Sequence, residues 1–140
     1  MNVRLSVMFA LIALIAVPVA GGAADPKSGP AHITTTQRFL MAWSHEQWDE
    51  LRAVSADSVS VKIGDKTFAL NPVAQKSDVA LVLPFRGLST VRSGMEVKGV
   101  TVGELHVRAG GQDTQGAAMV ALTEQEGDFR VVGVSLDAAR

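Results

Sequence analysis

Three side chains of different chemistry occupy alternate positions in one segment: Glu104, His106 and Arg108. On a β-strand, residues two apart project from the same face, so these three are expected to lie side by side. The glutamate could orient the imidazole as a general base, and the arginine could bind an anionic substrate or oxyanion. The intervening Leu105 and Val107 favour a simpler interpretation, in which the polar set faces water and the apolar pair faces the core.

Other residues are weaker candidates for a site. Asp57 could be a pocket carboxylate, although its place between a predicted helix and a predicted strand also suits a turn. His32 and His45 are expected to be solvated. One histidine and one carboxylate fall short of the three protein ligands of a catalytic zinc, so no metal site is predicted. The candidates for lining a ligand site are Trp43, Trp48, Arg108 and Met119, and Met119 also suits a place in the core.

Composition excludes several classes of function. The 140 residues carry 13 basic and 14 acidic side chains, and this balance gives no electrostatic reason to expect a nucleic-acid partner. The chain has no Cys, which excludes disulfides, thiol nucleophiles and thiolate metal sites, and no Tyr, which excludes a phenolic acid. No cofactor is predicted.

The first 24 residues have the order of a secretory signal peptide. Arg4 precedes an apolar run, and small residues after Pro18 offer a cleavage site following Ala23 or Ala24. The run is shorter than the roughly 20 residues of a membrane-spanning helix, so no stable membrane anchor is predicted. We expect export to the periplasm or the medium, a flexible lead-in over 25–32, and a single domain over 33–140.

Two short helices are predicted at the start of this domain. Thr34 and Gln37 form a capping box for a helix over 35–43. Ser44 and Gln47 form another for a second helix that ends near residue 56. In that arrangement Trp43 and Trp48 would pack together as a hydrophobic staple, which gives both tryptophans a structural role.

The pattern then changes to that of β-structure. Alternating apolar residues and a Gly-Asp-Lys turn predict a hairpin over 58–70. Four long strands follow, over 79–92, 95–109, 114–125 and 128–137, with Pro84 marking an edge or a bulge. These elements predict an α+β fold with two N-terminal helices packed on a strongly curved antiparallel sheet.

The segments 38–59 and 127–137 resemble the opening helices and the last strand of nuclear transport factor 2-like proteins, a cystatin-like α+β superfamily with a cone-shaped sheet. The resemblance implies a cone whose open end can hold a small apolar ligand. It also implies dimers formed through the sheet. Enzymes of this kind place an Asp/His or Asp/Tyr set inside the cone, and this sequence lacks Tyr and scatters its histidines.

Two hypotheses of function follow. The first is an exported non-catalytic module that binds a small apolar ligand or a protein partner. The second is a small cofactor-free isomerase, dehydratase or cyclase that uses His106 with a nearby carboxylate. Segments 117–122 and 131–136 are apolar on both faces, and two short helices can cover only one of them. We therefore expect a homodimer through the sheet.

Overall fold

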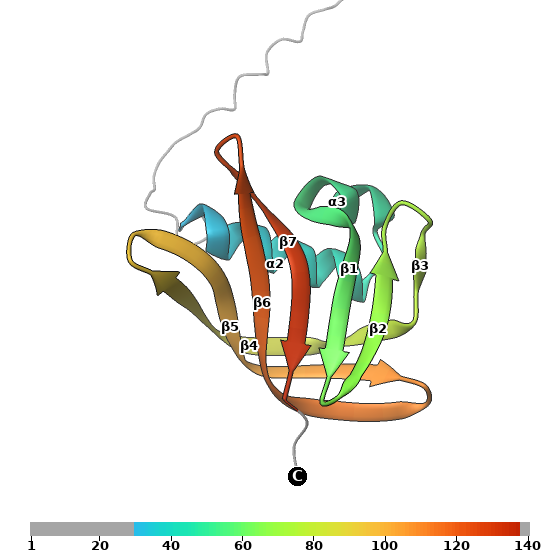
Figure 1. The fold of residues 1–140 in the computed structure, drawn as a ribbon. Coiled ribbons are helices and arrows are strands. Elements are labelled where there is room, and N and C mark those ends of the chain that lie inside the picture. Colours follow the sequence, from blue (N-terminus) through green and yellow to red (C-terminus); the bar gives the residue numbers. More distant parts are fainter. Residues whose placement is uncertain (1–29, 138–140) are drawn as a thin grey trace, which may run out of the picture.

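The computed structural model describes residues 30–137, which form a strongly curled sheet with both helices on one of its faces (Figure 1). The predicted signal peptide lies outside the described residues. In chain order the elements are α2 (Ala31–Ser44), α3 (Trp48–Val54), β1 (Ser55–Ile63), β2 (Lys66–Asn71), β3 (Lys76–Ser77), β4 (Val79–Ser93), β5 (Glu96–Ala109), β6 (Gln112–Gln125) and β7 (Asp128–Leu136).

The seven strands have the order β3-β2-β1-β7-β6-β5-β4. Each of the four long predicted strands, β4 to β7, begins and ends within two residues of its predicted bounds. The hairpin over 58–70 is also confirmed, as β1 and β2. The sheet is not purely antiparallel as predicted, because the last strand, β7, pairs in parallel with β1. The sheet is therefore mixed, because the chain end returns to its centre. The predicted α+β class is confirmed.

Strand β4 is an edge strand, as Pro84 predicted. Its register against β5 shifts between Val82 and Arg86, around that proline. A second shift, between Val102 and Leu105 of β5, changes the register against β6. Such irregularities increase the local twist and bend of the strands, and they account for the turn of β4 and β5 beneath the rest of the sheet in Figure 1.

Helix α2 differs from its prediction at both ends. It begins at Ala31, inside the expected lead-in, and its N-cap is Pro30, whose carbonyl accepts the N–H groups of Ile33 and Thr34 at 3.0 Å. Thr34 is therefore not a cap. The helix is longer because His32 and Thr36 continue the buried stripe of Phe39 and Leu40 toward the N-terminus.

The predicted cap and staple of the second helix are wrong. Ser44 ends α2, where its hydroxyl donates to the carbonyl of Met41 at 2.8 Å, and α3 has Gln47 as its N-cap. Glu46 between the helices has a positive φ of 52°, and this conformation turns the chain. Trp43 is thereby directed into the core as a residue of α2, whereas Trp48 is half-buried at its margin.

The core lies between the helices and the inner face of the sheet. Helix α2 crosses this face and supplies its large side chains, whereas the strands supply mostly valine and leucine at alternate positions. The largest fully buried side chains are Trp43, Phe39, Leu40, Leu51, Leu70, Leu105, Val54, Val59, Val61, Val100, Val102 and Val107.

Candidate functional site

The set Glu104, His106 and Arg108 lies on the outer face of the sheet, which we define as the face turned away from α2. Leu105 and Val107 between them are fully buried, so the alternation has the orientation that the simpler interpretation predicted. The side chain of His106 is 27% exposed. The three candidates are indeed neighbours, but they are outside the cone.

Their partners differ from those that the catalytic hypothesis requires. The Nε of Arg108 lies 2.6 Å from Oδ1 of Asp113, and this hydrogen bond is the main cause that lowers the pKa of Asp113. The Nε2 of His106 is 3.7 Å from Oδ2 of the same carboxylate. Glu104 instead pairs with Nε of Arg86 at 3.1 Å and accepts a hydrogen bond from Gln115.

Sequence reasoning missed Asp113 as the acidic member of this set. Residues 110–113 lie between two predicted strands, and the register of β5 against β6 places Asp113 directly opposite Arg108. Pairing of oppositely charged residues across an antiparallel hairpin is the signal that could have found it. The cluster is a solvated charge ladder, in which the carboxylate closest to His106 is already bound by an arginine.

Asp57 is not part of this set. It is exposed on β1, whereas His106 is on β5, with β7 and β6 between the two strands. Asp57 lines a separate polar depression with Arg52 and Arg130. The Nη1 of Arg130 donates there to the carbonyls of Arg52 at 3.0 Å and Ser55 at 3.2 Å. These carbonyls lie at the C-terminal end of α3, so Arg130 satisfies acceptors that a helix end leaves open.

The two tryptophans have unequal positions. Trp43 is 2% exposed, and its Nε1 donates to the carbonyl of Val79 at 3.0 Å. Its ring centroid is 5.7 Å from that of Phe39. Trp48 packs against the margin of the core and is half-buried. Trp43 is therefore a structural residue, because it is buried and its indole N–H already donates to a backbone carbonyl.

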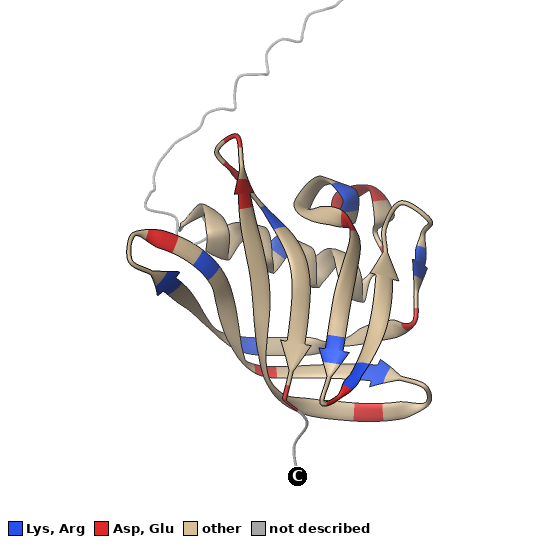
Figure 2. Ribbon diagram, viewed as in Figure 1, with Lys and Arg blue, Asp and Glu red and all other residues tan. Residues whose placement is uncertain are grey.

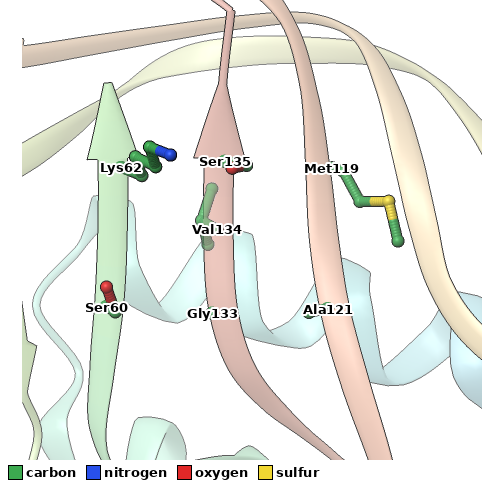
Figure 3. Close-up of a pocket in the computed structure, with 7 residues that line it drawn as sticks. All are labelled: Ser60, Lys62, Met119, Ala121, Gly133, Val134 and Ser135. Carbon is green, nitrogen blue, oxygen red and sulfur yellow. The ribbon is translucent and has the colours of Figure 1, made fainter. Parts of the chain in front are cut away.

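Met119, by contrast, projects from the outer face. Figure 3 shows Met119 on β6 and Lys62 on β1, on either side of β7, where the side chain of Val134 lies behind the ribbon on the core side. These residues line a shallow hollow of about 380 Å³. We call this depression the outer hollow. Its lining residues are Ser60, Lys62, Met119, Ala121, Gly133, Val134 and Ser135.

The outer hollow belongs to a broader uncharged area. Two rows of paired residues cross strands β1, β7, β6 and β5, and Lys62 is the one charged residue among the eight. We call them the central outer face: Ser60, Gly133, Ala121 and Gly99 in one row, and Lys62, Ser135, Met119 and Thr101 in the other. Figure 2 shows the charged residues toward the ends of β1, β7 and β6, with the middle of these strands free of them.

Gly99 allows β5 and the side chain of Met119 to pack closely in this area. A Cβ at position 99 would lie 2.5 Å from the carbonyl oxygen of Val120 and 2.7 Å from Cε of Met119. The methionine side chain therefore lies across the glycine, in space that any larger residue would occupy.

His32, expected to be solvated, is instead 5% exposed at the start of α2. Its Nε2 is 2.7 Å from Oγ1 of Thr90 on β4. His45 is exposed, as predicted. The buried polar or charged side chains of residues 30–137 are His32, Thr36 and Ser55.

Comparison with solved structures identifies the fold. A nuclear transport factor 2-like protein from Cytophaga hutchinsonii matches 76% of this chain over 94% of its own, with 13% identity and a TM-score of 0.51. A putative scytalone dehydratase from Novosphingobium aromaticivorans matches 79% over 83% of its own chain, with 10% identity and a TM-score of 0.53. This chain has the nuclear transport factor 2-like fold. The predicted resemblance is thereby confirmed at the level of the fold.

The nuclear transport factor 2-like fold includes non-catalytic binding proteins as well as enzymes, so it does not decide the function. An LEH-like epoxide hydrolase from M. tuberculosis also matches, over 78% of this chain and 79% of its own, with 13% identity and a TM-score of 0.50. No protein-family model matches the sequence, and no curated protein matches it.

Residues 30–137 carry neither a candidate metal cluster nor a candidate membrane-spanning helix. Within this range no group of three or more His, Asp or Glu residues is arranged to hold a metal ion. None of the helices described there has the length and apolar character needed to span a bilayer.

Proposed function

We propose that this chain is an exported, non-catalytic module that binds a protein partner through the central outer face, and that this partner is first of all a second copy of the chain. The supporting observation is the chemistry of that face. A sheet face in water normally carries many charged and polar side chains, whereas only one of these eight residues is charged and four of them are Gly, Ala or Met. Such a face suits burial against another protein surface.

A two-fold dimer is the simplest assembly that covers this surface, because the same self-complementary patch on both copies closes the assembly. The face offers both parts of a fit: the flexible side chain of Met119 lies on it across Gly99, and the floor around Ala121 and Gly133 is open to about 380 Å³. With sheets packed face to face, the methionine of one copy would fill the outer hollow of the other. Buried methionine adapts well to such irregular space.

A small apolar ligand is the second candidate occupant. The volume of the outer hollow lies within the roughly 300–1,000 Å³ of small-molecule sites. The inner face supports this candidate less well, because Trp43, Phe39 and Leu105 fill it. A ligand would therefore bind on the same outer face as a protein partner, and the two occupants would compete.

The catalytic hypothesis has less support. General acid-base catalysis by His106 needs a carboxylate that orients the imidazole within a pocket that can hold substrate. His106 lies on the outer face, and the Asp113 carboxylate beside it is bound by Arg108. Binding through the sheet requires no such arrangement.

The test is the oligomeric state of a charged variant. Met119→Arg places a cation in the centre of the proposed interface, whereas the control Gln112→Arg adds the same charge at the exposed β5–β6 hairpin. Light scattering after size exclusion should show a dimer for the wild type and for Gln112→Arg and a monomer for Met119→Arg. A dimer that persists in Met119→Arg, with unchanged affinity, would refute this interface.

A further inference from the structure

The first turn of α2 connects two strands that are distant within the sheet. The Nε2 of His32 lies 2.7 Å from Oγ1 of Thr90 on β4. The same imidazole meets the ring of Phe129 on β7 edge-on, with ring centroids 5.7 Å apart. Because β6 and β5 separate β7 from β4, a single side chain bridges the two sides of the curled sheet. His32 therefore closes the end of the curl at which the β4–β5 and β6–β7 hairpins lie.

The turn that carries His32 is the first turn of α2. Its N-cap, Pro30, makes no side-chain cap, and its first turn contains no acidic residue. The hydroxyl of Thr36 donates to the carbonyl of His32 at 2.8 Å, which couples the histidine to the next turn of the helix. A change at the imidazole would thus be transmitted directly to the beginning of α2.

We propose that His32 is an acid-released latch: the neutral imidazole holds the first turn of α2 across the end of the curled sheet, and protonation releases that turn. A released turn would uncover Phe129 and the end of the inner face. Acidity would then control access to apolar surface that is closed at neutral pH.

Three features oppose a positive charge at this position. The side chain is 5% exposed, so an imidazolium would lose most of its hydration. It lies in the first turn of a helix, where the dipole disfavours cations. Burial is the main cause that lowers the pKa of His32, and the positive charge of Arg92 on β4 lowers it further.

The sign of the pH effect follows from this direction. A histidine whose pKa is lowered in the closed form contributes stability above its ordinary value of about 6.5, and this contribution is lost as the pH falls below it. The closed turn is therefore expected to be complete at neutral pH and weakened in acid.

The other charged groups around this end of the sheet do not offset Arg92. Glu96 and Lys98 of β5 pair with each other at 3.2 Å. Arg130 of β7 is held by two backbone carbonyls. The remaining acidic residues of the β6–β7 hairpin, which are all exposed, are Glu124, Glu126 and Asp128.

Amide hydrogen exchange between pH 7.5 and 4.5 tests the latch. With exchange rates corrected for their intrinsic pH dependence, protection of the amides at 33–36 should be constant above pH ~6.5 and fall below it, by at most about tenfold per pH unit. Protection of Val120, in the centre of β6, should stay constant. A parallel loss at Val120 would indicate general unfolding and would overturn the proposal.

Three variants identify the group responsible. His32→Gln keeps a side chain that can form a hydrogen bond with Thr90 but cannot titrate, so the loss of amide protection in acid should vanish. His45→Gln changes an exposed histidine and should leave that loss of protection intact. Arg92→Gln should make the loss of amide protection in acid smaller, because the pKa of His32 moves back toward its ordinary value.

Should His32→Gln not fold, an NMR titration of the wild-type imidazole replaces it. The proposal then requires that the loss of protection follow the titration of His32. Constant protection in the wild type, or the same fall in a folded His32→Gln, would show that His32 is no latch.

Discussion

The indole Nε1 of Trp43 donates a hydrogen bond to the carbonyl of Val79 at 3.0 Å, and this bond joins α2 to the first residue of β4. The two residues are 36 positions apart in the chain. The bond satisfies a polar atom of the largest side chain in the core and fixes α2 relative to an edge strand. Trp48 packs only against the margin of the core.

Replacement of Trp43 by Ala is therefore expected to destabilise the fold by about 3–5 kcal/mol, the range for a buried aromatic residue. Trp48→Ala should cost clearly less, because Trp48 is half-buried. Urea unfolding of both variants measures the difference. Equal losses would mean that the margin of the core at Trp48 is as tightly packed as its centre.

Gly99→Ala is expected to destabilise the protein by about 1–3 kcal/mol, as overpacking does, because the new Cβ would meet the carbonyl of Val120 at 2.5 Å. Gly103→Ala is a matched control on the same strand, since the atoms nearest to its Cβ are 3.5 Å away or more. Thermal unfolding of the two variants should separate them. A neutral Gly99→Ala would show that β5 and β6 can move apart at this point.

Asp113→Asn should have little effect on stability even though it removes the partner of Arg108 and His106. Both Arg108 and Asp113 are more than a third exposed, and surface ion pairs contribute about 0–1 kcal/mol. Denaturant unfolding at low and high salt provides the measurement. A loss of unfolding free energy well above this range would show that the charge ladder stabilises the fold despite its exposure.

Export is expected to remove the leader. Mass spectrometry of the protein recovered outside the cytoplasm should show a new N-terminus near Asp25, as the order of basic, apolar and small residues predicts. Full-length chain in the membrane fraction would contradict the export proposal.

Most of the sheet could be predicted from local signals. Long alternating segments bounded by Gly-rich turns predicted β4 to β7, and the alternation around His106 predicted which side chains are buried. The parallel pairing of β7 with β1 could not be predicted in this way. It joins residues more than 70 positions apart, and no turn between the two strands specifies their register.

Burial of individual polar residues was the least predictable feature. The segment before His32 is rich in Pro, Gly and Ser and predicted a lead-in, but the histidine has partners on β4 and β7 that come together only in the curled sheet.

Val134 illustrates the opposite case. Two apolar faces were predicted for 131–136, yet Val134 is buried in the core and only Val132 and the small residues face outward. A charge at Val134 would therefore test folding, whereas a charge at Val132 tests the outer face.

Sedimentation equilibrium of the wild-type protein at micromolar concentration is the most direct test of the claim that the central outer face is a protein-binding surface. We predict a single species at twice the mass of one chain, which Met119→Arg converts to the mass of one chain without a change in secondary structure. A wild-type protein that sediments at the mass of one chain throughout this range would contradict self-association through the sheet.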